Sequence, residues 1–366
     1  MSRMTFRDFM ARSLADPFHG YYTRNARIGF DGGDFYTAPE LTPAFALLLT
    51  KQIMELDRAL NYPSEFYLME AGPGNGTLMR DILISVKMIA PSFFSRIRPV
   101  LFEVSSRLKE IQIGKLGSVE GVVPRWVDGS SLDVKIGIPF TGMILGNEFL
   151  DAMPVHRLRK TPDGVCELYV EEIAENRFQE IEGDLSDCSL IEGLHAPPKE
   201  LPDGFEWEVE KEMCRMVSAF DRVLERGFML WIDYGDSAFE RFSSRRAKGT
   251  LLGYRSHEVV ENVLSFAPGS IDLTVHVDFP LLAGHLASIG YKVEGFTDQM
   301  TFLANLGMEN LLLEEGLTEE EKSRMMTLIH PFRMGQAFKV MLLSKGEVSP
   351  VPWSGFQGAG LHWEYL

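Results

Sequence analysis

The residues whose types and spacing best suit chemistry lie in the stretch EAGPGNGTLM, residues 70–79. Here the acidic Glu70 is followed by three glycines at alternating positions, Gly72, Gly74 and Gly76. Glycine adopts backbone angles with positive φ and lets a ligand approach the main chain closely. The spacing therefore indicates a turn that binds a ligand, although a tight turn without a ligand would use the same residues.

The segments on either side of this turn predict a strand and a helix. The preceding run FYLME, residues 66–70, is short, apolar and aromatic, as in a strand buried on both faces. The following run TLMRDILISVKMI, residues 77–89, repeats apolar residues at helical spacing. Because a helix start offers free N–H groups and the positive end of the helix dipole, a nucleotide-like ligand is expected there.

The position of the third glycine distinguishes this turn from a dinucleotide-binding turn, which has the spacing GxGxxG. Here the glycine comes one residue earlier, giving GxGxG, and an acidic residue ends the strand. This pattern is typical of proteins that bind S-adenosylmethionine, because an acidic residue suits the ammonium and sulfonium charges of that ligand. The predicted cofactor is therefore S-adenosylmethionine, and its predicted binding residues in this stretch are Glu70, Gly72, Pro73, Gly74, Gly76 and Thr77.

Strands and helices continue to alternate after this turn, which predicts an α/β fold. Further strands are expected over residues 98–105, over 121–129 and ending near 147, so the sheet should be parallel with crossover helices. Ligands bind beyond the carboxyl ends of such strands. Glu103 is expected to accept hydrogen bonds from both ribose hydroxyls. Asp128 is expected either to meet the adenine amino group or to be an ordinary turn residue.

Composition limits the partners of this 366-residue chain. Its formal net charge of −16 argues against general binding to nucleic acid or to anionic membranes. The three cysteines, Cys166, Cys188 and Cys214, show neither metal-ligand nor disulfide spacing, so we predict a reducing compartment and no metal. The apolar runs are too short to span a membrane, and the N-terminus has no hydrophobic signal core. A cytoplasmic location is therefore predicted.

The order of the predicted elements divides the chain into five parts. These are an N-terminal helical and lid region at 1–62, the first half of a Rossmann-like domain at 63–154, an inserted subdomain at 155–226, the second half of the domain at 227–345 and a tail at 346–366. A long amphipathic helix is predicted over 206–226, stopped by Gly227. In the tail, Trp353 and Trp363 look exposed, and the tail is expected to contact a partner, pair with a second copy or pack on the core.

The lid region contains a glycine-rich segment, IGFDGGDFYTAPELTP, at residues 28–43. Its candidate substrate-contacting residues are Asp34, Tyr36, Thr37 and Glu40. A loop of this composition is expected to be either a lid over the site or a surface connection.

Several segments together resemble one known family. They are DPFHGYY (16–22), GDFYTAPEL (33–41), EAGPGNGTLM (70–79), GNEFLDAMPVHR (146–157), WIDYG (231–235), GTLLGYRSH (249–257), IDLTVHVDF (271–279) and MGQAFKVM (334–341). The chain resembles the MidA family of methyltransferases, which includes a mitochondrial complex I assembly factor that methylates arginine. The resemblance implies a class I S-adenosylmethionine-binding fold. By analogy it also implies symmetric dimethylation of an arginine on a respiratory complex I subunit, by what looks like a bacterial member.

The segment GNEFLDAMPV contains residues that suit arginine as a substrate. Glu148 and Asp151 are expected to grip a guanidinium with paired hydrogen bonds, because carboxylates and guanidinium groups match in geometry. Asn147 is expected to orient the substrate through its amide, and His276 or Asp278 to accept the proton. As alternatives, Asp151 would cap a helix that begins near residue 152, and His276 would be a structural histidine.

Two further functions stay open beside arginine methylation. One is an assembly chaperone that binds S-adenosylmethionine but needs little or no catalysis, and the other is a small-molecule methyltransferase. Enzymes that methylate amino groups of nucleic acids commonly carry an Asn/Asp-Pro-Pro-aromatic motif where this chain has NEFL, at residues 147–150. The predicted partner is therefore a protein substrate and not nucleic acid, and a homodimer is left open.

Overall fold

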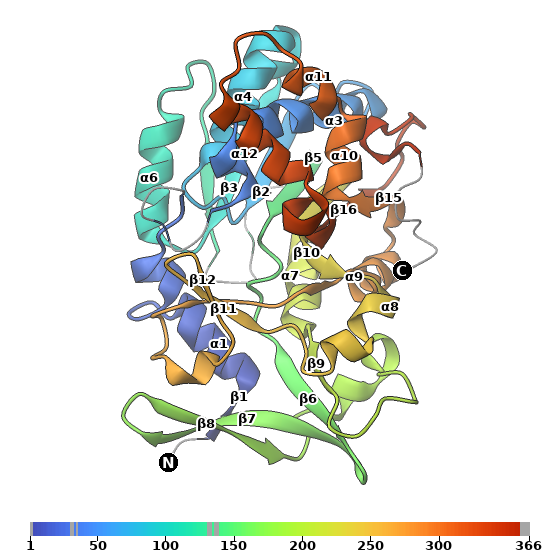
Figure 1. Ribbon diagram of the computed structural model, residues 1–366. Helices are drawn as coiled ribbons and strands as arrows, with labels where there is room; N and C mark the ends of the chain where they lie inside the picture. The colour runs from blue at the N-terminus through green and yellow to red at the C-terminus, as the bar shows by residue number, and fades with distance from the viewer. Residues whose placement is uncertain (1–2, 30–32, 34–35, 130–133, 135–138, 359–366) are drawn as a thin grey trace.

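The computed structural model describes residues 3–29, 33, 36–129, 134 and 139–358. Within these ranges the chain builds one large sheet with helices on both faces, which confirms the predicted α/β class (Figure 1). No helix in these ranges combines the length and the apolar character needed to cross a bilayer.

The central sheet has the strand order β15-β16-β10-β5-β2-β3-β4. The strands in this order are β2 (Phe66–Ala71), β3 (Ile97–Glu103), β4 (Arg125–Asp128), β5 (Phe140–Asn147), β10 (Leu224–Asp236), β15 (Lys292–Asp298) and β16 (Phe338–Lys345), and the short β14 (Val277–Asp278) also pairs with β10. β2 runs parallel to β3 and β5, and β10 runs parallel to β5, whereas β16 is antiparallel to both of its neighbours. The carboxyl ends of β2, β3 and β5 therefore meet at one edge of the sheet, where ligands bind in folds of this kind.

Successive residues of the central strands face two separate hydrophobic cores, because side chains alternate along a strand. In β2, Leu68 belongs to one core and Met69 to the other. The first core contains residues of α3 (Ala44–Ala59), α4 (Thr77–Ile89), α5 (Pro91–Phe94), α6 (Ser106–Leu116), α10 (Gln299–Asn305), α11 (Met308–Leu312) and α12 (Glu319–Ile329). The second contains residues of α7 (Lys211–Asp221) and α9 (Phe279–Ser288). Both faces of the sheet are thus covered.

A second, antiparallel sheet lies at the foot of the molecule in Figure 1. It is formed by β6 (His156–Thr161), β7 (Gly164–Ala174), β8 (Arg177–Gly183), β9 (Glu206–Val209) and the N-terminal β1 (Arg3–Thr5). The turn between β6 and β7 falls at residues 162–163, where the sequence has Pro-Asp before Gly164. Because β1 pairs with β7, the start of the chain is tied to this sheet.

The helix predicted over residues 206–226 is wrong at both ends. Glu206–Val209 form β9, which pairs with β6, and α7 ends at Asp221. Glu206 of β9 also forms an ion pair with Arg157 of β6, at 2.8 Å between Nη2 and Oε2, which adds to the pairing of the two strands. Gly227 lies inside β10 with a φ of 148°, opposite Gly142 of β5, where an added Cβ would collide with the neighbouring backbone.

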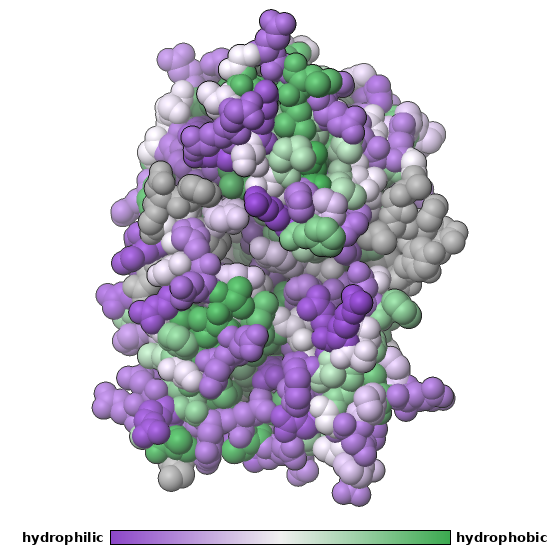
Figure 2. Space-filling model, in the orientation of Figure 1, coloured by the Kyte–Doolittle hydropathy of each residue, from purple (hydrophilic) through white to green (hydrophobic). Residues whose placement is uncertain are grey.

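A third, smaller sheet lies between the N-terminal helix and the central sheet (Figure 1). It comprises β12 (Glu258–Val260), β11 (Leu252–Arg255) and β13 (Asp272–Thr274), and its core is shared with α1 (Phe6–Ala15). Apolar residues gather over β11 and β12 in Figure 2, where Val259 is 55% exposed. The remaining short elements are α2 (Ala38–Leu41), α8 (Ala238–Arg241), η1 (Tyr21–Asn25), η2 (Cys188–Ile191), η3 (Gly193–His195), η4 (Ser244–Arg246), η5 (Val263–Ser265), η6 (Pro331–Gly335) and η7 (Ser354–Phe356).

The first part of the C-terminal tail packs on the core. Trp353 is buried, against the expectation from sequence that it is exposed. Its ring lies edge-on to Phe228 with the centroids 5.4 Å apart, and its Nε1 donates a hydrogen bond to Glu294 at 3.1 Å. Trp363 lies outside the described residues.

Candidate active site

A cavity of about 290 Å³ lies at the carboxyl ends of β2, β3 and β5. Its floor is formed by residues that follow these strands, from the glycine turn, from the end of β3 and from the segment after β5. Of the residues predicted for the cofactor and for catalysis, those that line it are Glu70, Gly72, Pro73, Gly74, Thr77, Glu103, Asn147, Glu148 and Asp151. The topology of the sheet therefore brings together residues from three separate strand ends.

The two acidic strand ends, Glu70 and Glu103, are both buried at the cavity wall. Burial raises the pKa of Glu70 to about 8, and its Oε2 has no hydrogen-bond partner among the described residues. Burial likewise raises the pKa of Glu103 to about 7, although its carboxylate accepts hydrogen bonds from Ser105 N and Gln112 Nε2, both at 2.8 Å. A cation or a hydrogen-bond donor in the cavity would favour the ionised form of both carboxyl groups.

Glycine is required at the three positions of the turn for different structural reasons. All three adopt positive φ, with 63° at Gly72, 52° at Gly74 and 82° at Gly76. A Cβ at Gly72 would lie 2.6 Å from the ring of Phe149, so this glycine is needed for packing. A Cβ at Gly74 would approach only the Cδ1 of Ile28, at 3.2 Å, and both residues line the cavity. Gly76 is the N-cap residue that precedes α4, and it does not line the cavity.

The segment after β5 folds into a tight turn that carries Glu148 and Asp151. Glu148 has a φ of 52°, which is uncommon for a residue with a side chain. Its carboxylate accepts hydrogen bonds from Asn147 Nδ2 at 3.1 Å and from the backbone N of Ala38 at 3.2 Å. The carboxylate of Asp151 accepts a hydrogen bond from the hydroxyl of Thr274 at 2.6 Å. No helix begins near residue 152 in this described segment, so the alternative function of Asp151 as a helix cap is wrong.

The pKa values of these two carboxyl groups are raised. For Glu148 burial is the main cause and the charge of Asp151 adds to it, giving a pKa of about 8. For Asp151 burial raises the pKa to about 6, against the effect of the hydrogen bond from Thr274. These two neighbouring carboxyl groups resist ionisation together, so a bound cation would favour their ionised forms.

The predicted lid segment reaches the cavity in part. Tyr36, Thr37 and Glu40 line the cavity, and α2 begins next to Glu148 through the hydrogen bond from Ala38. Asp34 lies outside the described residues. The segment therefore covers the carboxylate that was predicted to bind the substrate.

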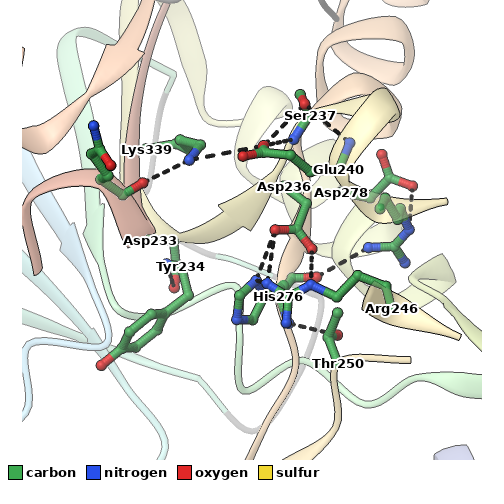
Figure 3. A network of polar contacts seen from close by, with 12 residues as sticks. Asp233, Tyr234, Asp236, Ser237, Glu240, Arg246, Thr250, His276, Asp278 and Lys339 are labelled. Carbon is green, nitrogen blue, oxygen red and sulfur yellow. Dashed lines mark hydrogen bonds and ion pairs between the residues drawn. The ribbon is translucent and has the colours of Figure 1, made fainter. Parts of the chain in front are cut away.

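Besides Gly76, the predicted site residues Asp128 and His276 do not line the cavity. Asp128, at the end of β4, is exposed, although the next residue, Gly129, is part of the cavity wall. His276 lies one layer behind the wall, where its Nδ1 is 3.1 Å from Asp236 and 3.0 Å from Arg246 (Figure 3). Its ring stacks on Tyr234, which does line the cavity. Asp278, the alternative proton acceptor, caps the start of α9.

The ionisable carboxyl groups in the described cavity wall have no basic side chains among them. The acidic residues that line it are Glu40, Glu70, Glu103, Glu148, Asp151, Glu212 and Asp272, whereas no lysine, arginine or histidine occurs among the described lining residues. Glu212 is already paired with Arg7, at 3.0 Å. The other carboxyl groups face the cavity without a basic side chain in its wall, an arrangement that suits cationic ligands. The unpartnered Oε2 of Glu70 and the absence of a side chain at Gly74, which lines the cavity, fit the cationic methionine end of S-adenosylmethionine.

Residues 48–297 match the family model described as "Putative S-adenosyl-L-methionine-dependent methyltransferase". The chain belongs to this methyltransferase family. A Bos taurus relative named protein arginine methyltransferase NDUFAF7, mitochondrial, is 30% identical to this methyltransferase over 374 residues, which cover 93% of this chain and 80% of the relative. The Homo sapiens protein of the same name is 28% identical over 378 residues, with coverage of 93% and 80%.

Solved structures support the same assignment. The methyltransferase is similar to a COG1565 superfamily member from Burkholderia thailandensis bound to S-adenosyl-homocysteine, with a TM-score of 0.85, 27% identity and coverage of 100% of this chain and 92% of the other. A native structure from the same organism gives a TM-score of 0.84 at 25% identity, with coverage of 100% and 92%. These findings confirm the resemblance to the MidA family and the predicted cofactor, S-adenosylmethionine.

The sequence analysis missed part of the cavity wall of the methyltransferase. The missed residues include Tyr22, Tyr234, Tyr254, Asp272 and Thr274. All five lie in segments that carry the family resemblance, DPFHGYY, WIDYG, GTLLGYRSH and IDLTVHVDF. The family resemblance was the signal that could have identified these residues, because no spacing within the sequence links their segments.

Asp233, also not among the predicted site residues, holds the turn that carries the two catalytic candidates. Its Oδ2 accepts hydrogen bonds from the backbone N of Phe149 at 3.0 Å, of Leu150 at 2.8 Å and of Asp151 at 3.3 Å. One buried carboxylate thus satisfies three successive N–H groups, and burial raises the pKa of Asp233 well above its usual range.

We expect Asp233→Ala to lower the free energy of unfolding by about 2 kcal/mol or more, because three buried N–H groups lose their acceptor. Asp233→Asn keeps an acceptor oxygen and should lose less. Urea denaturation of both variants checks this expectation. Equal stability of Asp233→Ala and the unmodified protein would contradict the assigned function of Asp233.

Proposed function

We propose that this methyltransferase is a protein arginine N-methyltransferase that dimethylates arginine symmetrically, on a respiratory complex I subunit or its bacterial counterpart. The observation that carries the proposal is the pair of carboxyl groups of the partly buried Glu148 and the buried Asp151, in a cavity wall without described basic side chains. The names of the Bos taurus and Homo sapiens relatives favour arginine as the methylated residue. The target protein itself follows only from the family resemblance.

For the cofactor, we infer that Glu70 and the turn from Gly72 to Thr77 hold the methionine end of S-adenosylmethionine, with Glu103 on the ribose hydroxyls. Asp128 stays the candidate for the adenine amino group, next to Gly129 in the wall. When bound, S-adenosylmethionine supplies a methyl group on a positively charged sulfur. The negative cavity wall favours the binding of such a cation.

For the substrate, Glu148 and Asp151 bind the N–H groups of the guanidinium, and Asn147 orients it. The carboxylates draw positive charge towards the nitrogens that do not react, so that the reacting nitrogen becomes a better nucleophile. The methylated guanidinium keeps one positive charge, and the proton that its reacting nitrogen loses passes to Glu148. The raised pKa of that carboxyl group suits a proton acceptor near neutral pH. The lid segment, from Tyr36 to Glu40, excludes water.

Activity should depend on pH through these two groups. We expect kcat/KM for an arginine peptide to rise as the pH increases from about 6 to about 8, because Asp151 and Glu148 must be ionised to bind a guanidinium. Because these two pKa values are raised by folding, the folded, ligand-free protein keeps the protons of Asp151 and Glu148 in a pH range in which the unfolded chain has lost them. The same pH increase should therefore lower the free energy of unfolding. Rates and urea denaturation measured across this range check both directions, and a flat rate profile would contradict the assignment.

Label transfer tests the proposed function. The protein is incubated with S-adenosylmethionine labelled in its methyl group and with extract proteins, and the products are analysed by mass spectrometry. Label in symmetric dimethylarginine of a complex I subunit or its counterpart would support the proposal. Cofactor binding without any transfer would favour the assembly chaperone, and label in a metabolite would favour a small-molecule methyltransferase.

A further inference from the structure

Three segments outside the central sheet contribute side chains to the cavity wall. Tyr22 comes from η1, Tyr254 from β11, and Asp272 and Thr274 from β13. The functions proposed above for Glu148, Asp151 and Asn147 leave this part of the wall without a function.

The small sheet fixes the positions of these side chains. In the antiparallel pair of β11 and β13, Tyr254 lies opposite Asp272 and Leu252 lies opposite Thr274. Residues directly opposite each other share a face of the sheet, so Tyr254, Asp272 and Thr274 point to the same side. All three line the cavity.

Two hydrogen bonds fasten this sheet to the turn that carries the catalytic candidates. The hydroxyl of Thr274 donates to the carboxylate of Asp151 at 2.6 Å, and the backbone N of Val275 donates to the carbonyl of Asp151 at 3.1 Å. Asp272 therefore has a defined position relative to the carboxylates of the turn.

Asp272 is buried, with 6% of its surface exposed, and it interacts with the groups around it. Its charge contributes to the raised pKa of Glu148, after the larger effects of burial and of Asp151. Burial raises the pKa of Tyr22 well above its usual range, and a hydrogen bond to Asp272 adds to this effect. The side chain of Asp272 is thus held by Tyr22 within electrostatic reach of Glu148.

An unsatisfied acceptor in the same wall indicates that the ligand carries a hydrogen-bond donor. Asn147 is 8% exposed, its Nδ2 donates to Glu148, and its Oδ1 has no hydrogen-bond partner among the described residues. A buried acceptor without a partner is costly, unless a bound ligand donates to it. Together with the carboxylates, this oxygen provides several acceptors, which favours a ligand with several N–H donors.

The shape of the wall distinguishes two kinds of cation. Tyr22, Tyr234 and Tyr254 bring aromatic rings to the cavity. A guanidinium is planar, carries five N–H donors in one plane and stacks on aromatic faces, whereas an ammonium is a compact group with three donors. The rings and the spread of acceptors match the planar group better.

Resting on the proposed function, we propose that Asp272, with Tyr22 and Tyr254, forms a subsite that receives the end of the guanidinium that is not being methylated. Asp272 accepts hydrogen bonds from the non-reacting nitrogens, and Tyr22 positions its carboxylate. Asp272 is therefore the residue that makes the site prefer a guanidinium over an ammonium.

Binding of two small cations to the protein saturated with S-adenosyl-homocysteine tests this subsite. Methylguanidinium and methylammonium are titrated calorimetrically into the unmodified protein, Asp272→Asn, Tyr22→Phe and the control Glu258→Gln, which changes an exposed carboxylate of the same small sheet. We expect Asp272→Asn to weaken methylguanidinium binding by about tenfold or more, since hydrogen bonds to charged groups are lost. Tyr22→Phe should give a smaller loss. Methylammonium should bind weakly throughout, and Glu258→Gln should match the unmodified protein.

The outcomes separate this inference from the proposed function. With the arginine peptide, Asp272→Asn should raise KM by a factor similar to the loss in methylguanidinium binding and should change kcat little. Unchanged methylguanidinium affinity in Asp272→Asn, with normal affinity for S-adenosyl-homocysteine, would overturn the subsite. If Asp272→Asn fails to bind S-adenosyl-homocysteine, the same criterion is applied to Tyr22→Phe: unchanged methylguanidinium affinity in that variant would overturn the subsite. Failure of the unmodified protein to methylate any arginine would instead overturn the proposed function.

Discussion

The Glu148→Gln variant should bind S-adenosylmethionine as the unmodified protein does and transfer methyl groups to an arginine peptide at least about a hundredfold more slowly. Loss of one group that stabilises charge in a transition state commonly costs this much. Glutamine is nearly the same size, and its carbonyl oxygen can still accept the hydrogen bonds from Asn147 and Ala38. The variant therefore removes the negative charge and the proton acceptor but keeps the local structure.

Glu175→Gln provides a matched control for this change, because Glu175 is exposed in the turn between β7 and β8. Calorimetry with S-adenosylmethionine and rates of label transfer are measured for both variants. Normal transfer by Glu148→Gln would move the substrate-binding carboxylate elsewhere in the cavity.

The Gly74→Val variant should lose cofactor binding by about a hundredfold or more while the rest of the fold stays intact. The new side chain would point towards Ile28 across the cavity, and a φ of 52° is unfavourable for valine. The valine side chain occupies space that the cofactor needs, and about 3 kcal/mol of lost binding energy corresponds to about a hundredfold in affinity. The backbone strain is also present in the free protein, so it lowers stability and not affinity.

Gly193→Val separates these two causes. Gly193 has a similar φ of 57°, and a Cβ there would have open space around it. The control should therefore show backbone strain without loss of cofactor affinity. If Gly74→Val bound S-adenosylmethionine normally, the assignment of the glycine turn to the cofactor would be wrong.

The floor of the site could be predicted from sequence because it depends on local patterns. FYLME reads as a buried strand, the glycines after it read as a turn, and Glu103 ends the next apolar run. Parallel pairing of β2 with β3 and β5 then brings these strand ends to one edge. A short-range pattern and one general rule of topology were sufficient.

The cover of the site could not be predicted in the same way. Tyr22, Tyr254 and Asp272 are far apart in sequence and meet only because β11 pairs with β13 beside α1. The helix predicted over 206–226 failed for a related reason. Helical spacing is real in α7, but Trp207 and Val209 belong to a strand whose pairing with β6 has no local signal.

Histidine 276 shows the limit of reasoning from residue type alone. A histidine near acidic residues suggests a proton acceptor, yet the ring of His276 is bound by Asp236 and lies behind Tyr234. These contacts indicate that His276 supports Tyr234, which lines the cavity.

A crystal structure of the protein with S-adenosyl-homocysteine tests the central claim most directly. We predict density for the ligand along the turn from Gly72 to Thr77, with its ribose hydroxyls on Glu103, its amino group near Glu70 and its sulfur facing Glu148. Density elsewhere on the protein, or a cavity that stays closed by its own side chains at saturating ligand, would contradict the claim.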